Sequence, residues 1–348
     1  MPFILRRLVF YAVAAWVALT INFFIPRAIP GNAVQNVMAK FPNLQPSAYK
    51  ALEALLGVGH PGSLWSQYVS YLDEIFHFNF GTDVSQYPAS VSSLLVQTLP
   101  WTITLVGVAT VIAFLIGTAL GIVAGWRHGG TLDRVLPGLM FLQAIPYFFF
   151  ALILVELLAI KTQVFPSGQG YADGLIPGWH WDFISSALYH SALPALTIVL
   201  TSIAGWMLQM RNVMITTTGE DYVIAAQAKG LPNRRVIYTY AARNALLPQL
   251  QGFGLAVGFV VSGAIVMEIV FGYPGIGLLL LNAVTSNDYP LMQAIFLVIT
   301  FAVLLANLVS RGTIEQHILH VLETKINLFE LVVGELDMIL GRVTDDFD

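Results

Sequence analysis

The densest group of residues able to do polar chemistry lies in Gly219–Pro248, where acids, bases and phenols interrupt long apolar runs. Glu220 and Asp221 open a predicted helix, because carboxylates suit the positive end of a helix dipole. Gly230 followed by Pro232 predicts the end of that helix. These residue types and this spacing favour a docking element over a site of catalysis.

One face of this predicted helix is small and amphipathic. Tyr222, Ala225, Ala226 and Lys229 fall at i, i+3, i+4 and i+7, so they are expected to share that face. Two methyl-sized side chains beside a phenol and an ammonium admit close approach by another surface. A surface-exposed helical hairpin that contacts no partner is the alternative interpretation.

Composition places these residues in a membrane protein. Of 348 residues, 57% are hydrophobic and only 10% are charged, against roughly 25% charged in soluble domains. A membrane helix needs about 20 mostly apolar residues to cross a hydrocarbon core about 30 Å thick. We therefore predict an all-α polytopic membrane protein with six transmembrane helices. The six stretches are Leu8–Ile25, Leu99–Ala124, Leu136–Ile160, Leu193–Met210, Leu250–Phe271 and Leu291–Val309.

The basic residues predict the orientation of the chain. If the N-terminus is cytoplasmic, the outer segments hold only Arg27, Lys40, Lys50 and Lys161, and the inner segments hold the rest of the 16 Lys and Arg residues. Basic residues accumulate in cytoplasmic loops, so both termini and Gly219–Pro248 are expected inside. The net charge of −4 gives no indication of nucleic-acid binding, and the absence of cysteine excludes disulfides and thiolate metal sites.

A stripe without side chains runs along the predicted second helix, at Gly117, Gly121 and Gly125. Small residues at every fourth position let membrane helices approach closely. The sequence leaves open whether the partner helix belongs to this chain or to a second subunit.

Five residues in or beside the predicted spans are candidates for a transport pathway or gate: Pro146, Glu156, Glu268, Phe271 and Pro274. A proline inside a span kinks the helix, so Pro146 either shapes a pathway or only packs. An acid inside a span is a functional candidate by default. Glu156 lies toward the outer end of its span, whereas Glu268 suits an outer gate or a hydrogen bond that holds the glycine-rich turn after it.

Several of these motifs resemble one family. Asp221–Val223, Ala228–Leu231 and Arg243–Pro248 are similar to the coupling loop of ABC importer permeases, in the dipeptide, oligopeptide and nickel branch. Phe271–Gly277 resembles the glycine-rich turn of the same branch, whereas Gln227 stands where an Arg is usual. The resemblance implies contact with an ATPase subunit through Glu220, Asp221, Tyr222, Ala225, Ala226, Lys229, Gly230 and Leu231.

The resemblance also implies a fold and its divisions. The expected fold is that of type I ABC importer permeases, with an extracellular cap segment and a cytoplasmic coupling helix. The implied parts are an N-terminal transmembrane helix over 1–32, an extracellular segment over 33–97, a permease core over 98–310 with the coupling loop 219–248, and a cytoplasmic tail over 311–348.

The function implied is that of a transport subunit and not an enzyme. The chain has no G-x-x-x-x-G-K-S/T phosphate loop, so ATP and Mg²⁺ are expected on partner ATPases, with no cofactor or metal on this chain. The implied partners are a second homologous permease, two cytoplasmic ABC ATPases, an extracytoplasmic solute-binding protein and membrane lipid, in the cell membrane of a bacterium or archaeon.

Peptides are the first expected cargo, and oligosaccharides or nickel are alternatives with the same architecture. An ATP-independent channel or secondary transporter is an alternative of a different class. That class is expected to show inverted repeats or paired intramembrane charges, and the sequence shows neither.

Overall fold

The computed structural model describes residues 2–28, 63–83, 86, 88–258, 260 and 265–313. These residues are mostly helical and contain no strand, only one isolated bridge between Thr82 and Ser90. The all-α prediction is therefore confirmed. Residues 33–62 of the expected extracellular segment and 314–348 of the expected tail lie outside the described residues.

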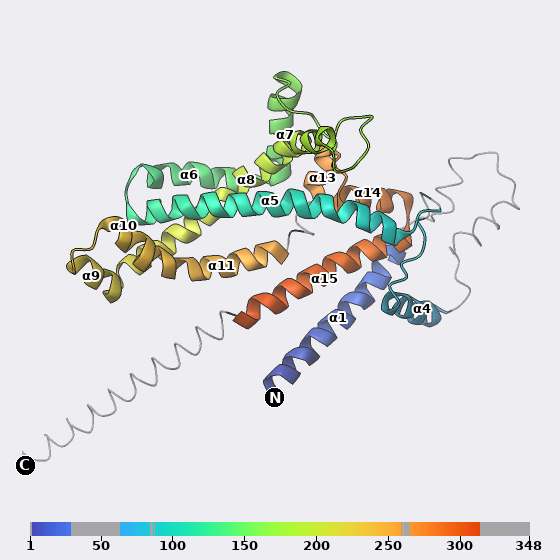
Figure 1. The fold of residues 1–348 in the computed structure, drawn as a ribbon. Helices are drawn as coiled ribbons and strands as arrows, with labels where there is room; N and C mark the ends of the chain where they lie inside the picture. The colour runs from blue at the N-terminus through green and yellow to red at the C-terminus, as the bar shows by residue number, and fades with distance from the viewer. Residues whose placement is uncertain are drawn as a thin grey trace, which may run out of the picture.

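The described helices follow one another along the chain as a bundle of long helices joined by short ones (Figure 1). Their bounds are α1 Pro2–Ala28, α4 Leu64–Phe76, α5 Val91–Trp126, α6 Thr131–Ala144, α7 Tyr147–Leu154, η1 Val155–Lys161, α8 Trp181–Thr218, α9 Asp221–Ala228, α10 Asn233–Arg235, η2 Val236–Ala242, α11 Arg243–Gly258, α13 Ile265–Phe271, α14 Ile276–Ser286 and α15 Tyr289–Thr313.

Three of the described helices are each long and apolar enough to cross a membrane, namely Val9–Ala28 of α1, α5 and α8. Two bent pairs also pass that test, α6 with Tyr147–Lys161 at 96° and α13 with α14 at 84°. The apolar stretch of α15 is shorter, over Tyr289–Leu305. The membrane character is thus confirmed, but the third expected single helix, Leu136–Ile160, is broken.

The break in the third expected span lies at Pro146. This proline is the N-cap of α7, and Ile145 before it has the extended conformation (φ −74°, ψ 128°) that a following proline favours. A single helix over Leu136–Ile160 is therefore wrong, and the bend expected at Pro146 is confirmed. In the fifth expected span, the structure has α11 and α13, followed by α14, which the sequence analysis did not predict.

Helices α5 and α8 form the centre of the molecule and lie side by side along most of their length (Figure 1). A Cβ atom added to Gly117 or Gly121 would lie 2.6 Å from the Cβ of Trp206 or Met210, and one added to Gly125 would lie 2.5 Å from the Cβ of Met214. The partner of the glycine stripe is therefore α8 of this same chain.

The short helix α4 packs at the C-terminal end of α1, next to the N-terminal part of α15. Tyr68 and Tyr71 of α4 are buried around Phe23 of α1. The Tyr68 hydroxyl lies 2.7 Å from Thr20 Oγ1, and Asn22 Nδ2 donates to the Tyr71 hydroxyl at 3.0 Å and to the Gln293 carbonyl of α15 at 2.9 Å. This part of the expected extracellular segment therefore packs on the helices.

Candidate functional site

The predicted docking helix is α9, and its ends lie where the sequence places them. Glu220 is the N-cap, and its carbonyl accepts hydrogen bonds from Val223 N at 2.9 Å and Ile224 N at 3.1 Å. At the other end, Gly230 N donates to the Gln227 carbonyl at 2.9 Å and Leu231 N donates to the Ala226 carbonyl at 3.4 Å. These two bonds form a Schellman motif, which satisfies the last carbonyls of the helix.

Gly230 has a left-handed backbone, with φ +71°. No atom lies within 4 Å of a Cβ added there, so the space around the residue is open. The need for glycine comes from the backbone conformation, which costs about 1–2 kcal/mol for a residue with a side chain.

The two faces of α9 differ in what they contact. Val223 and Ala226 are 0% and 2% exposed and pack into a cluster with Met210 and Met214 of α8. The outward side holds the exposed residues Tyr222, Ile224, Ala225, Gln227 and Lys229. The predicted shared face of Ala225 and Ala226 is therefore wrong, because Ala226 faces the protein interior and only Ala225 is open to a partner.

The second arm of the hairpin holds α9 in place. It begins with α10, continues as the π-helix η2 and joins α11. Ala241, Ala242 and Ala245 are at most 5% exposed and complete the cluster under α9. Three methyl side chains keep this arm close to α8, so α9 rests on a packed base.

A shallow hollow of about 200 Å³ lies beside α9, at the ends of α5 and α8. The residues that line it are Gly125, Trp126, His128, Ile215, Thr218 and Gln227. A protruding side chain of a partner has room to enter there, next to the outward face of α9.

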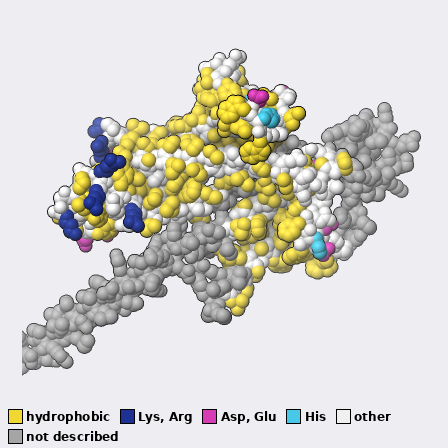
Figure 2. All heavy atoms as spheres, viewed as in Figure 1, with side chains coloured by type: hydrophobic (Ala, Val, Ile, Leu, Met, Phe, Trp, Pro, Cys, Tyr) yellow, Lys and Arg dark blue, Asp and Glu magenta, His cyan; other side chains and the backbone are white. Residues whose placement is uncertain are grey.

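Basic side chains gather around this hairpin. Figure 2 shows the Lys and Arg side chains over the end of the molecule that carries α9 and α10, whereas apolar side chains cover the neighbouring face. The exposed basic residues are Arg127, Arg134, Lys229, Arg234, Arg235 and Arg243. This asymmetry is the one expected of a cytoplasmic end.

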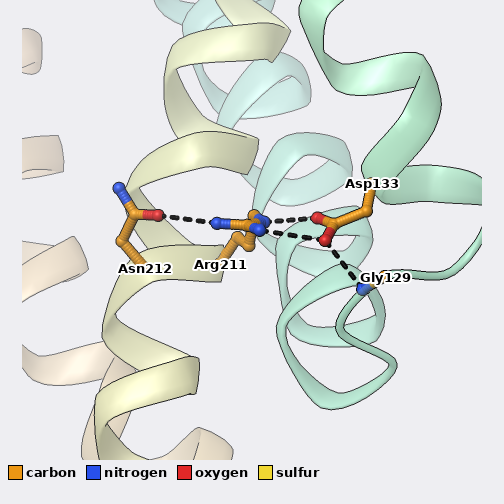
Figure 3. Close-up of polar contacts among 4 residues, drawn as sticks. All are labelled: Gly129, Asp133, Arg211 and Asn212. Carbon is orange, nitrogen blue, oxygen red and sulfur yellow. Dashed lines mark hydrogen bonds and ion pairs between the residues drawn. The ribbon is translucent and has the colours of Figure 1, made fainter.

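An ion pair ties the first turn of α6 to α8, about two turns before the hairpin. The Arg211 guanidinium reaches both carboxylate oxygens of Asp133, through Nε to Oδ1 and through Nη2 to Oδ2 at 2.9 Å (Figure 3). Gly129 N also donates to Asp133 Oδ2 at 2.9 Å. The side chains are only 20% and 11% exposed. The sequence analysis missed this pair, because 78 residues separate its members.

Glu268 lies far from the hairpin, in α13, just before the turn between α13 and α14. It is fully buried, and its carboxylate accepts hydrogen bonds from Thr102 Oγ1 of α5 at 2.6 Å and from Gly277 N at 2.5 Å. Thr102 Oγ1 in turn accepts a hydrogen bond from Ile276 N at 2.9 Å. The sequence left two roles open for Glu268, an outer gate and a hydrogen bond that holds the glycine-rich turn. The structure shows that hydrogen bond, from Gly277 N to the carboxylate.

Phe271 and Pro274 belong to the same turn and support the loop before α8. Phe271 is 1% exposed, and its carbonyl accepts a hydrogen bond from Gln169 N at 2.7 Å. A Cβ atom on Gly170 would lie 2.7 Å from the ring of Pro274. Both residues therefore hold the loop before α8 against the turn between α13 and α14.

The other two pathway candidates are not brought to this turn by any described contact. Pro146 is exposed at the break before α7. Glu156 lies in η1 and forms a 3.5 Å ion pair with Lys161, with half or more of each side chain exposed. Among the described residues, no group of three or more His, Cys, Asp or Glu side chains is placed to hold a metal ion.

Comparisons with known proteins agree with this geometry. Residues 117–315 match the family described as binding-protein-dependent transport system inner membrane component. The chain is 30% identical to the dipeptide transport system permease protein DppB of Escherichia coli, over 88% of this chain and 95% of the relative. It is 31% identical to the oligopeptide transport system permease protein OppB of Salmonella typhimurium, over 86% and 92%. It is 29% identical to the oligopeptide transport system permease protein AppB of Bacillus subtilis, over 83% and 89%.

Proposed function

Because this chain belongs to the family of binding-protein-dependent transport system inner membrane components, we propose that it is a transmembrane subunit of an ABC importer for peptides. The family match bears out the resemblance to binding-protein-dependent permeases, on which the proposed coupling role of Gly219–Pro248 rests. Peptides are proposed ahead of oligosaccharides and nickel, because relatives similar over most of their length are named as dipeptide and oligopeptide permeases.

The proposed assembly supplies what this chain lacks. Two ATPase subunits bind ATP and Mg²⁺ at the cytoplasmic side, a second homologous permease completes the pathway, and a solute-binding protein delivers the peptide from outside. The basic end around α9 and α10 is proposed to face the cytoplasm, which agrees with the distribution of Lys and Arg side chains.

The observation that carries the proposal is the division of α9 into two faces. Its outward face offers Tyr222, Ala225 and Lys229 to a partner, and its inward face packs on Met210 and Met214 of α8. A displacement of α9 is therefore transmitted directly to α8, because the two helices already pack against each other in this buried cluster. Nucleotide binding to the ATPases biases an equilibrium between outward-open and inward-open states through this contact.

The experiment that tests the proposal is gentle purification of the tagged chain from its native membrane, followed by identification of the proteins that accompany it. Two ATPase chains and a second permease are the expected companions. A chain that purifies alone and transports without ATP would contradict the proposal and support a channel.

A surface variant sharpens the test. Ala225→Glu places a larger, charged side chain on the exposed face of α9 and should release the ATPases without disturbing the buried cluster. Ser70→Glu makes the same kind of change on the exposed side of α4, at the other end of the molecule, and should release nothing.

A further inference from the structure

Three glutamine side chains lie along the contacts that α8 makes with α6 and α11, inside or at the edge of apolar spans. Gln143 of α6 lies over Gly205 of α8, where an added Cβ atom would be 3.0 Å from Gln143 Nε2. Gln209 of α8 lies over Gly252 of α11, where an added Cβ atom would be 3.2 Å from Gln209 Nε2. Each amide head thus lies against a glycine of the neighbouring helix.

Two of these amides have spare hydrogen-bonding capacity. Gly205 and Gln209 are four residues apart on α8, so Gln143 and Gln209 lie on the same side of that helix. Gln143 is exposed and Gln209 is half-buried. No described residue donates to or accepts from either amide head.

The third amide is enclosed. Gln249 of α11 is 0% exposed, and its Nε2 donates to Thr118 Oγ1 at 3.2 Å and to the Trp206 carbonyl at 3.0 Å. Its Oε1 has no hydrogen-bond partner among the described residues. A buried acceptor without a partner costs about 1–3 kcal/mol, so its retention needs an explanation.

Lipid does not provide that explanation. Polar side chains in membrane spans face the bundle interior or a water-filled cavity and mark pathways. Of the three amides, those of Gln143 and Gln209 are open to a polar ligand, whereas that of Gln249 is enclosed. Between Asp182 and Arg211, α8 has no Asp, Glu, Lys or Arg, so the recognition available at this level is uncharged.

Aromatic rings border the same place. Trp206 lies 5.3 Å from Phe114 and 6.4 Å from Phe253, and the Phe114 and Phe253 rings are 4.4 Å apart, measured between ring centroids. Amides that donate and accept beside aromatic rings match a chain of peptide bonds with varied side chains.

We propose that the open amides of Gln143 and Gln209 form a subsite on the transport pathway that hydrogen-bonds the main-chain amides of a peptide in transit, with the enclosed Gln249 as a polar support that holds α11 to the Trp206 carbonyl of α8. This inference rests on the proposed import of peptides. The subsite hydrogen-bonds the peptide bond and makes no contact that depends on the peptide's side chains, so it accepts peptides of different sequence.

The test uses the whole complex, reconstituted in vesicles with its binding protein. Gln143→Leu and Gln209→Leu remove amide heads, and Gln97→Leu makes the same change at an exposed position near the start of α5. Each of the first two variants should reduce peptide uptake about two- to tenfold, since one hydrogen bond is removed. Gln97→Leu should not reduce it, and a peptide with N-methylated bonds should lose less uptake in the variants than the unmodified peptide does.

Three results would overturn the inference: unchanged uptake, equal losses for both peptides, or loss of the second permease from purified variants, which would make the amides a subunit contact. Absence of peptide uptake by the unmodified complex would instead refute the proposed function, and the subsite with it.

A second measurement does not depend on the leucine variants folding. Because the chain has no cysteine, Gln143→Cys and Gln209→Cys each introduce its only thiol. Peptide held in the complex should slow maleimide labelling of these two thiols. The control is Leu115→Cys, on an exposed part of α5, whose labelling rate should not change. Equal labelling with and without peptide at all three positions would also overturn the inference.

Discussion

The close contact between α5 and α8 gives a prediction with a built-in control. In Gly121→Ala, the new Cβ atom would lie 2.6 Å from Met210 Cβ and 2.7 Å from the Met207 carbonyl oxygen. Carbon atoms pack best at about 3.5–4.0 Å, so the helices must separate by about 1 Å. Such overpacking costs about 1–3 kcal/mol.

Gly107→Ala makes the identical change on the same helix, where no atom lies within 4 Å of the added Cβ. Both variants gain the same helix propensity, about 1 kcal/mol. The difference between them therefore isolates the steric cost, and Gly121→Ala should be less stable than Gly107→Ala by about 1–3 kcal/mol.

The assay is equilibrium unfolding of the purified chain in mixed micelles with increasing dodecyl sulfate, followed by tryptophan fluorescence. The three proteins are the unmodified chain and the two alanine variants. If Gly121→Ala is as stable as Gly107→Ala, then the two helices are not in the contact described here, and the glycine stripe packs elsewhere.

Three further predictions follow from single contacts. Glu268→Ala leaves the Thr102 hydroxyl and Gly277 N without their buried acceptor. It should lower the free energy of unfolding in the same assay by about 1–3 kcal/mol. Unchanged stability together with lost uptake would instead favour the gate role for Glu268. Gly230→Val should impair ATP-driven uptake in vesicles more than Gly230→Asn, because asparagine tolerates φ +71° far better; equal effects would refute the backbone argument. Asp133→Asn should cost about 1.5–3 kcal/mol of unfolding free energy by weakening the Arg211 pair, whereas Asp173→Asn, on an exposed loop, should stay within about 0.5 kcal/mol.

The hairpin is the part of the candidate site that the sequence predicts best, because its signals are local. Glu220, Asp221 and Gly230 act on the backbone within a few residues, and the structure has the helix ends where they predict them. The direction of the faces was less predictable. Spacing groups Ala225 with Ala226, but only tertiary contact with Met214 decides which of the two is buried.

Contacts between distant segments were beyond the sequence. Nothing near Thr102 distinguishes it from other residues of an apolar span, yet it joins Glu268 to the start of α14. Asp133 and Arg211 are ordinary flanking charges until the fold brings them together. The π-helices η1 and η2 were also missed, since their composition resembles that of the α-helices around them.

The arrangement of these contacts explains how a local push can act over the whole depth of the membrane. Helix α5 has 36 residues, which corresponds to a length of about 54 Å. Near one end, Thr102 joins Glu268 of α13 to the start of α14, and near the other, Gly117, Gly121 and Gly125 hold α5 close to α8. Because α9 packs on the same α8, a displacement of α9 reaches α5 through the close α5–α8 contact at these glycines. We therefore expect the two helices to move as one unit, together with the turn between α13 and α14 that Thr102 contacts.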